Sequence, residues 1–210
     1  MFGTIDLALF VAAGLLLNVT PGPDTLYIVG RSAAQGWRGG ALAALGIGAG
    51  CFVHIFAAAL GLSALLATSA AAFAAIKWIG AAYLVYVGIS LLRTRLQAPA
   101  ASGTLRAEEA RAVFVQGFLT NALNPKVALF FLAFLPQFIA PAAESKMLAF
   151  LFLGLLFNIN GTLWNLFVAW SSARVAGRFR HSGAFSLWLN RTVGAMFVGF
   201  GIRLASVHER

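Results

Sequence analysis

An aspartate and a lysine lie inside long apolar stretches of this chain, and each directly follows a proline. Asp24 follows Pro23 in the run LNVTPGPDTLY, and Lys126 follows Pro125 in NALNPKVAL. An ionised side chain at the centre of a bilayer costs about 3 kcal/mol or more, so neither residue should face lipid. We therefore expect both side chains to face the protein interior, where they can neutralise each other as an ion pair.

The prolines beside these charges predict two helix breaks. Proline has no N–H and removes a backbone hydrogen bond, and Gly22 permits positive φ. We expect the first helix to break at residues 20–23 and the fourth at residues 124–125. A break inside a membrane is tolerated where neighbouring groups or a water-filled cavity satisfy the freed backbone. The half-helix after each proline can bind a carboxylate, and the carbonyls before it can accept an ammonium or a cation.

The candidate binding residues are therefore those at the two breaks. They are Asp24, Lys126, Asn18, Thr20, Pro21, Gly22, Pro23, Asn121, Asn124 and Pro125. Asp24 alone could instead stabilise the start of a helix, and the asparagines could hydrogen-bond between helices. An aspartate and a lysine at two matching breaks favour a binding site over those structural roles.

The composition is typical of a polytopic membrane protein. The chain has 210 residues, of which 60% are apolar and 10% charged, and its mean hydropathy is +0.87. A spanning helix needs about 20 apolar residues. Six spans are predicted, over residues 4–30, 40–67, 70–92, 112–139, 146–171 and 185–205. The last is the weakest, because Asn190 and Arg191 lie near its start, and this leaves a five-helix alternative.

The spans form one transmembrane domain, residues 1–210, with an internal repeat. A polar linker at 93–111 separates repeat one, about 1–92, from repeat two, about 112–210. NVTPGPD, from residue 18, resembles NALNPK, from residue 121, and KWIGA, from residue 77, resembles RTVGA, from residue 191. With three helices in each repeat, the second copy is inverted, which is typical of secondary transporters with a site near mid-membrane. The matches are short, so chance similarity is the alternative.

The distribution of basic residues predicts the orientation. Most arginines lie in the loop at 31–39, the linker and the loop near 174–183, whereas few lie on the other side. The positive-inside rule makes the first set cytoplasmic and both termini periplasmic. It also explains the net charge of +9 without a nucleic-acid partner. We read the N-terminal segment as the first span and not as a removable signal.

Other features argue against different functions. There is no Walker A motif, hydrolytic triad or metal-ligand spacing, and the single cysteine, Cys51, forms no disulfide framework. These observations predict no cofactor and no metal site, and they argue against an ATP-driven pump and most catalysis.

Other polar and small residues in the spans are expected to have structural roles. His54 is expected to be a packed, hydrogen-bonded histidine. Glycines 46, 48 and 50 favour close helix packing, with dimerisation as a weaker interpretation. Asparagines 158, 160 and 165 should line the interior or join helices.

Two stretches resemble the signature regions of the LysE/RhtB amino-acid exporters. They are TPGPDTLYIVGRSAAQGWRGGALAALGIGAG and QGFLTNALNPKVALFFLAFLPQF. The family's TPGP(D) stretch maps onto Thr20 to Asp24 and its NPK onto Asn124 to Lys126. The resemblance implies efflux of amino acids or close derivatives across the bacterial inner membrane, driven by the proton motive force.

The sequence thus predicts a secondary exporter whose partners are an amino-acid substrate, protons and the bilayer, with a homo-oligomer left open. The substrate ammonium would take Asp24, and its carboxylate would take Lys126 or nearby half-helix N–H groups. The empty carrier could return a proton on Asp24. A metal-cation exporter is the alternative, disfavoured because a divalent cation needs several oxygen ligands and the spans hold one carboxylate. A third reading is a lipid-modifying enzyme that uses Asp24 and His54.

Overall fold

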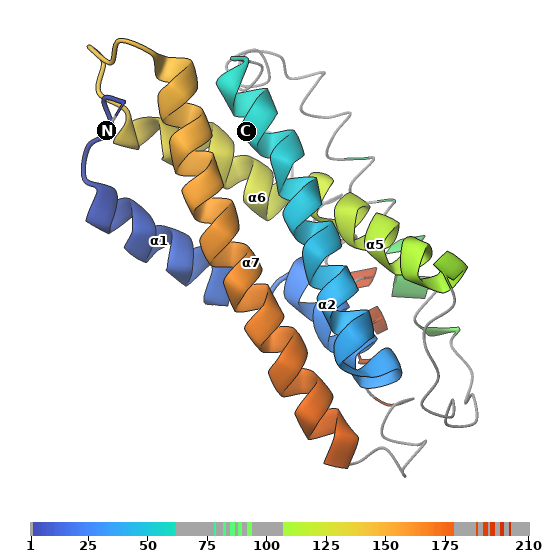
Figure 1. Ribbon diagram of the computed structural model, residues 1–210. Helices are drawn as coiled ribbons and strands as arrows, with labels where there is room; N and C mark the ends of the chain where they lie inside the picture. The colour runs from blue at the N-terminus through green and yellow to red at the C-terminus, as the bar shows by residue number, and fades with distance from the viewer. Residues whose placement is uncertain are drawn as a thin grey trace.

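The computed structural model describes residues 2–61 and 107–178, and isolated positions from 78 to 93 and from 188 to 202. This part of the chain is helical (Figure 1), and its one β-type contact is an isolated bridge between Thr4 and Ile139. The elements are α1 (Leu7–Val19), α2 (Pro23–Ala59), α5 (Ala107–Ala122), α6 (Pro125–Leu129), a π-helical turn η1 (Phe130–Phe134), a 3₁₀ turn η2 (Leu135–Phe138) and α7 (Lys146–Arg178). The all-α prediction is confirmed for these residues.

Both predicted helix breaks are present. The helix α1 ends at Val19, and α2 begins at Pro23 after Gly22, whose backbone is extended. In the second half, α5 ends at Ala122, and α6 begins at Pro125. The helical axis bends there by 44°. At each break a proline occupies the first position of the new half-helix, where its missing N–H is tolerated.

The helix α2 folds back on itself at Gly36. This residue has φ 69° and ψ −164°, a conformation that glycine adopts without a steric penalty. A Cβ built on Gly40 would lie 2.0 Å from the Ser32 hydroxyl oxygen, although residues eight apart in a straight helix are about 12 Å apart. The helix is thus a hairpin with arms at residues 23–35 and 37–59. A single non-helical residue makes the turn where the sequence suggested a loop at 31–39.

The described helices lie largely within four of the predicted spans. The helix α1 and the first arm of α2 lie largely in the range predicted for the first span, the second arm in that for the second, α5 to η2 in that for the fourth, and α7 in that for the fifth. By length and composition, α2 and α7 can cross a membrane, as can the bent pair of α5 with α6 to η2. The predicted spans at 70–92 and 185–205 lie largely outside the described residues. The predicted number of spans and the inverted relation of the two repeats therefore stay predictions.

Some span boundaries differ from the prediction. The helix α5 is described from Ala107, so it extends before the expected residue 112. The second arm of α2 ends at Ala59 and not near residue 67, and Gly61 follows with φ 75°. The helix α7 continues past residue 171 to Arg178.

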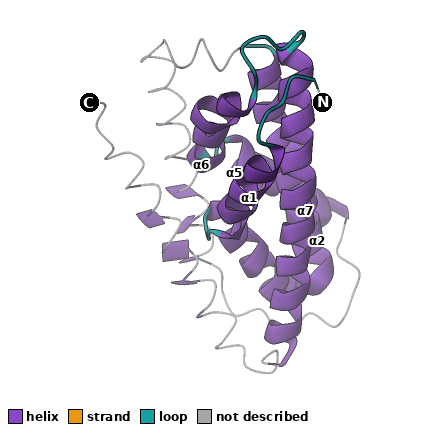
Figure 2. Ribbon diagram, turned by 90° about the vertical axis from the view of Figure 1, so that its left-hand side faces the viewer, coloured by secondary structure: helices purple, strands orange, loops and turns teal. Residues whose placement is uncertain are grey.

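The helix α2 is the centre of the described fold and packs mainly against α7 and α5. Its second arm runs beside α7 along the molecule, with α5 on its other side (Figures 1 and 2). A Cβ on Gly46 would lie 2.2 Å from the Phe114 carbonyl oxygen, and one on Gly50 would lie 2.3 Å from that of Phe118. The predicted close packing is therefore confirmed at Gly46 and Gly50, whose partner is α5 of the same chain, whereas a Cβ on Gly48 would lie 2.7 Å from the Thr162 hydroxyl oxygen of α7.

A cluster of phenylalanines joins α1 to the turns that follow α6. The rings of Phe10 and Phe138 meet edge to face at 5.3 Å, and those of Phe130 and Phe157 stack at 4.7 Å. The N-terminal segment adds backbone bonds, since the Ile5 N–H donates to the Phe138 carbonyl at 2.9 Å. We call Phe10, Phe130, Phe131, Phe138 and Phe157 the phenylalanine cluster. It fixes α1 and η2 together on one side of the breaks.

Candidate functional site

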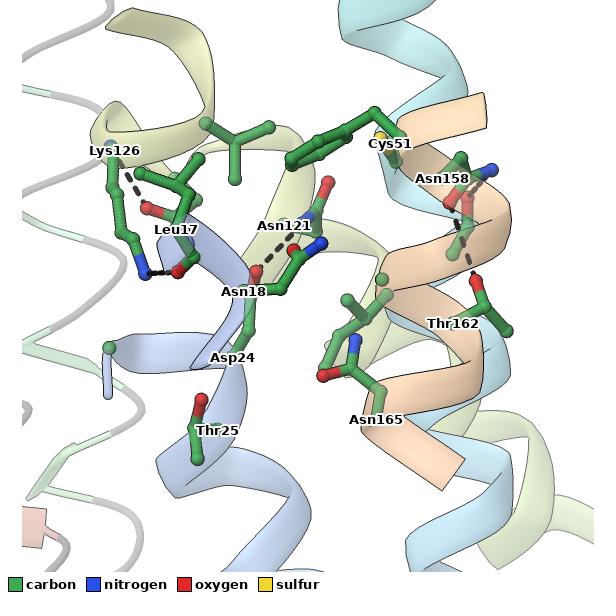
Figure 3. Close-up of a pocket in the computed structure, with 17 residues that line it drawn as sticks. Leu17, Asn18, Asp24, Thr25, Cys51, Asn121, Lys126, Asn158, Thr162 and Asn165 are labelled. Carbon is green, nitrogen blue, oxygen red and sulfur yellow. Dashed lines mark hydrogen bonds between the residues drawn. The ribbon is translucent and has the colours of Figure 1, made fainter. Parts of the chain in front are cut away.

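The two helix breaks meet around one cavity (Figure 3). Its volume is about 30 Å³, and its walls come from α1, both arms of α2, α5, α6 and α7. Of the predicted residues, the lining includes Asn18, Gly22, Asp24, Asn121, Asn124 and Lys126. Thr20, Pro21 and Pro23 are at the first break without being part of the described lining, and Pro125 begins α6 at the second break. A cavity of this size has room for roughly one or two water molecules, so the site is too small for an amino acid in this conformation.

The lysine of the second break is bonded to the backbone of the first. Lys126 donates from Nζ to the carbonyls of Leu17 at 2.5 Å and Thr20 at 2.7 Å. In a continuous helix, the Leu17 carbonyl would accept from the N–H of residue 21, but that residue is a proline. The Lys126 ammonium therefore replaces the donor that Pro21 lacks, through a charge-assisted hydrogen bond.

Asp24 is held by an asparagine of the second half. Its Oδ2 accepts a hydrogen bond from Asn121 Nδ2 at 2.8 Å. In the described part of the chain no salt bridge joins Asp24 to Lys126, so the structure differs from the expected direct ion pair. The reason is that the two carbonyls at the end of α1 take the ammonium, and the amide takes the carboxylate.

His54 plays the corresponding role at the second break. Pro125 removes the N–H that would pair with the Asn121 carbonyl. That carbonyl instead accepts from His54 Nε2 at 2.9 Å and from the Asn124 N–H at 2.8 Å. Because a carbonyl can only accept, Nε2 carries the proton. The prediction of a packed, hydrogen-bonded histidine is confirmed, and its partner is a proline-freed carbonyl in another span.

Three polar atoms at the cavity have no hydrogen-bond partner among the described residues. They are Asp24 Oδ1, Asn121 Oδ1 and Asn18 Nδ2, and all three are buried. Leaving such a group unpaired costs about 1–3 kcal/mol, so native proteins seldom do so without a reason. Two of the atoms accept and one donates, and their side chains lie close together at the cavity in Figure 3. The site thus offers unused polar groups of both kinds.

The helix α7 supplies a polar wall that the sequence located only in part. Asn158, Thr162 and Asn165 line the cavity, whereas Asn160 is not part of the lining. Asn158 donates from Nδ2 to the Gly48 carbonyl at 3.1 Å, so it both lines the site and joins helices. The spacing i, i+4, i+7 of the three lining residues was the available signal, because it places them on one face of an apolar helix.

A polar cluster joins the first arm of α2 to α5 on the side of the cavity toward Gly36. The Tyr27 hydroxyl donates to the Val113 carbonyl at 2.9 Å. Arg31 donates to Gln116 Oε1 at 2.5 Å and, from Nε, to the Tyr27 hydroxyl oxygen at 3.2 Å. The cavity therefore lies between the Tyr27–Arg31–Gln116 cluster and the phenylalanine cluster, and each cluster ties a first-half helix to a second-half one.

The chain is similar to known proteins over nearly its whole length. The family model described as LysE type translocator matches residues 15–207. The chain is 32% identical to an uncharacterized membrane protein of Pseudomonas aeruginosa, over 97% of this chain and 96% of that protein. It is 28% identical to proteins named leucine efflux protein from Enterobacter sp. (strain 638) and Salmonella typhimurium (strain LT2), each over 99% of this chain and 98% of the relative. No solved structure matches the chain.

Proposed function

The chain belongs to the LysE type translocator family, and from this premise we propose that it is a secondary exporter of amino acids or close derivatives. The proposal places it in the bacterial inner membrane, with both termini periplasmic and with the proton motive force as the energy source. Relatives named leucine efflux protein, matched over nearly the whole chain, support an amino acid as the cargo.

The observation that carries the proposal is the convergence of both breaks on one cavity that contains Asp24. Its Oδ1 is buried and unpaired, while its Oδ2 is held by Asn121. A carboxylate in such a place is suited to an incoming ammonium, which supplies both the opposite charge and the missing donor. Asp24 is therefore the proposed site for the substrate ammonium and, on the return step, for a proton.

The fold proposed for this activity is a single domain of six spans in two inverted repeats. Each repeat contributes one broken helix, which suits an alternating-access carrier with its site between the repeats. Because the cavity is too small for an amino acid, the proposed cycle has the Tyr27–Arg31–Gln116 cluster and the phenylalanine cluster open in turn. The cycle involves no covalent chemistry and no cofactor, so the proposed protein is not an enzyme.

Asp24→Asn is the direct test. Cells that lack other exporters for the substrate are loaded by feeding a leucine-containing dipeptide, and the leucine released is measured with and without a protonophore. The native chain should export, the protonophore should abolish export, and Asp24→Asn should reduce export to background while its membrane level, measured by immunoblot, persists. Full export by Asp24→Asn would remove the carboxylate from the mechanism.

A metal-cation exporter has no observation in its favour. Among the described positions there is no group of three or more His, Cys, Asp or Glu side chains that could hold a metal ion. Divalent cations bind through several oxygen ligands, and Asp24 is the one carboxylate among the lining residues that the structure describes.

A further inference from the structure

We propose that the cavity recognises both charged ends of an α-amino acid that has a neutral, apolar side chain, and that Asn18 and not Lys126 holds the carboxylate. This inference rests on the proposed export function and assigns the substrate groups within the same site. It follows from the hydrogen-bonding capacity that the cavity residues leave unused.

Two unpaired oxygen acceptors in the cavity indicate where the substrate ammonium binds. Asn121 Nδ2 donates to Asp24 Oδ2 at 2.8 Å, and this bond holds the two side chains next to each other. Their remaining oxygens, Asp24 Oδ1 and Asn121 Oδ1, are both buried and unpaired. An ammonium has three N–H donors and no acceptor, so it can satisfy both oxygens at once.

One unpaired N–H donor in the cavity indicates where the substrate carboxylate binds. Asn18 Nδ2 is buried and unpaired, and its side chain lies beside Asp24 and Asn121 in Figure 3. Lys126 is the other candidate, but its ammonium already bonds to the carbonyls of Leu17 and Thr20. Moving Lys126 to the substrate would leave the Leu17 carbonyl without a donor, because Pro21 supplies none. Asn18 can donate to the substrate carboxylate without breaking a hydrogen bond that the structure shows.

The helix α7 is shaped to keep Asn18 at the cavity. A Cβ on Gly161 would lie 3.1 Å from Asn18 Oδ1 and 3.2 Å from Nδ2, so the amide packs directly against the α7 backbone. A side chain at residue 161 would push the amide away. The cavity holds roughly one or two water molecules. To admit a ligand, α1 and α7 must therefore move further apart than they lie in this conformation.

The rest of the lining indicates the substrate side chain. Leu17, Ile47, Val127 and Phe157 provide an apolar surface beside the polar groups. Among the described lining residues Asp24 is the one carboxylate, and it is assigned to the α-ammonium. A second, basic group on the substrate would therefore be buried without a partner, at a high cost. The site consequently selects neutral, apolar amino acids.

The test measures binding of three probes to the purified full chain in detergent by isothermal titration calorimetry. The probes are leucine, leucinol, which lacks the carboxylate, and the 2-hydroxy acid analogue of leucine, which lacks the ammonium. Asn18→Ala should weaken leucine binding by about tenfold or more, as expected for a lost hydrogen bond to a charged group, and should leave leucinol binding within about twofold. Asn121→Ala should weaken leucine and leucinol but leave the hydroxy acid nearly unchanged.

Asn18→Asp and Asn160→Ala complete the design. Aspartate is nearly the same size as asparagine but replaces the N–H donor with an anion. Asn18→Asp should therefore weaken leucine binding more than Asn18→Ala does, and it should still bind leucinol. Asn160 is in α7 outside the cavity lining, and its alanine variant should bind all three probes as the native chain does. An unchanged ratio of leucine to leucinol affinity in both Asn18 variants would overturn the carboxylate assignment. Failure of the native chain to bind or export any amino acid would instead overturn the proposed function.

Discussion

The Lys126 ammonium donates to the Leu17 carbonyl, which is the carbonyl whose helical donor Pro21 removes. The second break repeats this arrangement, because His54 donates to the Asn121 carbonyl that Pro125 leaves without its helical partner. In both cases a side chain from another span replaces the missing N–H. The breaks are therefore stabilised by contacts between helices, and opening the site must either keep or exchange these donors.

Lys126→Met should destabilise the protein as well as impair transport. It removes the ammonium from the partly buried Leu17 carbonyl and from the exposed Thr20 carbonyl. The main cost is at Leu17, because an acceptor left unpaired away from water costs about 1–3 kcal/mol. We expect a lower Tm in thermal unfolding followed by circular dichroism of the purified protein. Lys146→Met, at the exposed start of α7, is the matched control and should leave Tm nearly unchanged. Equal Tm values for the two variants would show that the Lys126 contacts do not stabilise the break.

A double-mutant cycle at the second break should show strong coupling between His54 and Pro125. His54→Leu in the native chain removes a donor from the Asn121 carbonyl and should cost about 1 kcal/mol. In a Pro125→Ala background, residue 125 regains an N–H for that carbonyl, so the same His54→Leu change should cost less. Unfolding midpoints of the four proteins provide the measurement. Additive effects would mean that the histidine does not replace the donor that the proline removes.

Gly46→Ala should separate α2 from α5. The added Cβ would lie 2.2 Å from the Phe114 carbonyl oxygen, which belongs to the backbone and cannot rotate away. Overpacking of this kind typically costs about 1–3 kcal/mol. Gly199→Ala is the control, because no atom of the described residues lies within 4 Å of a Cβ built there. A lower Tm for Gly46→Ala alone is expected, and tolerance of both changes would argue against the close contact.

Weakening the Tyr27–Arg31–Gln116 cluster should expose the cavity. Gln116→Leu removes the acceptor of the Arg31 guanidinium and should favour opening on that side. Cys51 reports on this change, because it is buried, lines the cavity and is the single cysteine of the chain. Labelling of Cys51 by N-ethylmaleimide should be faster in Gln116→Leu than in the native chain, and leucine should slow it. Equal labelling rates would show that the cluster does not close the site.

Several features of the fold follow from the sequence because their causes are local. A proline lacks an N–H wherever it stands, so the breaks at residues 20–23 and 124–125 could be predicted from residue type. The inward orientation of Asp24 and Lys126 follows equally from the cost of an ionised group in lipid. Helix ends were less predictable. The sequence pattern suggested a loop at 31–39, but the turn needs only Gly36. Glycine adopts the required backbone conformation without a steric penalty.

The tertiary structure alone decided which groups meet. Opposite charges suggested that Lys126 would pair with Asp24, but the bonds to Leu17 and Thr20 show that freed carbonyls compete for the ammonium. Nothing in the sequence near His54 identifies the Asn121 carbonyl as its partner, since that contact depends on the placement of α2 beside α5. A residue's type determines which donors and acceptors a break leaves unsatisfied. The packing of distant helices determines which side chain reaches them.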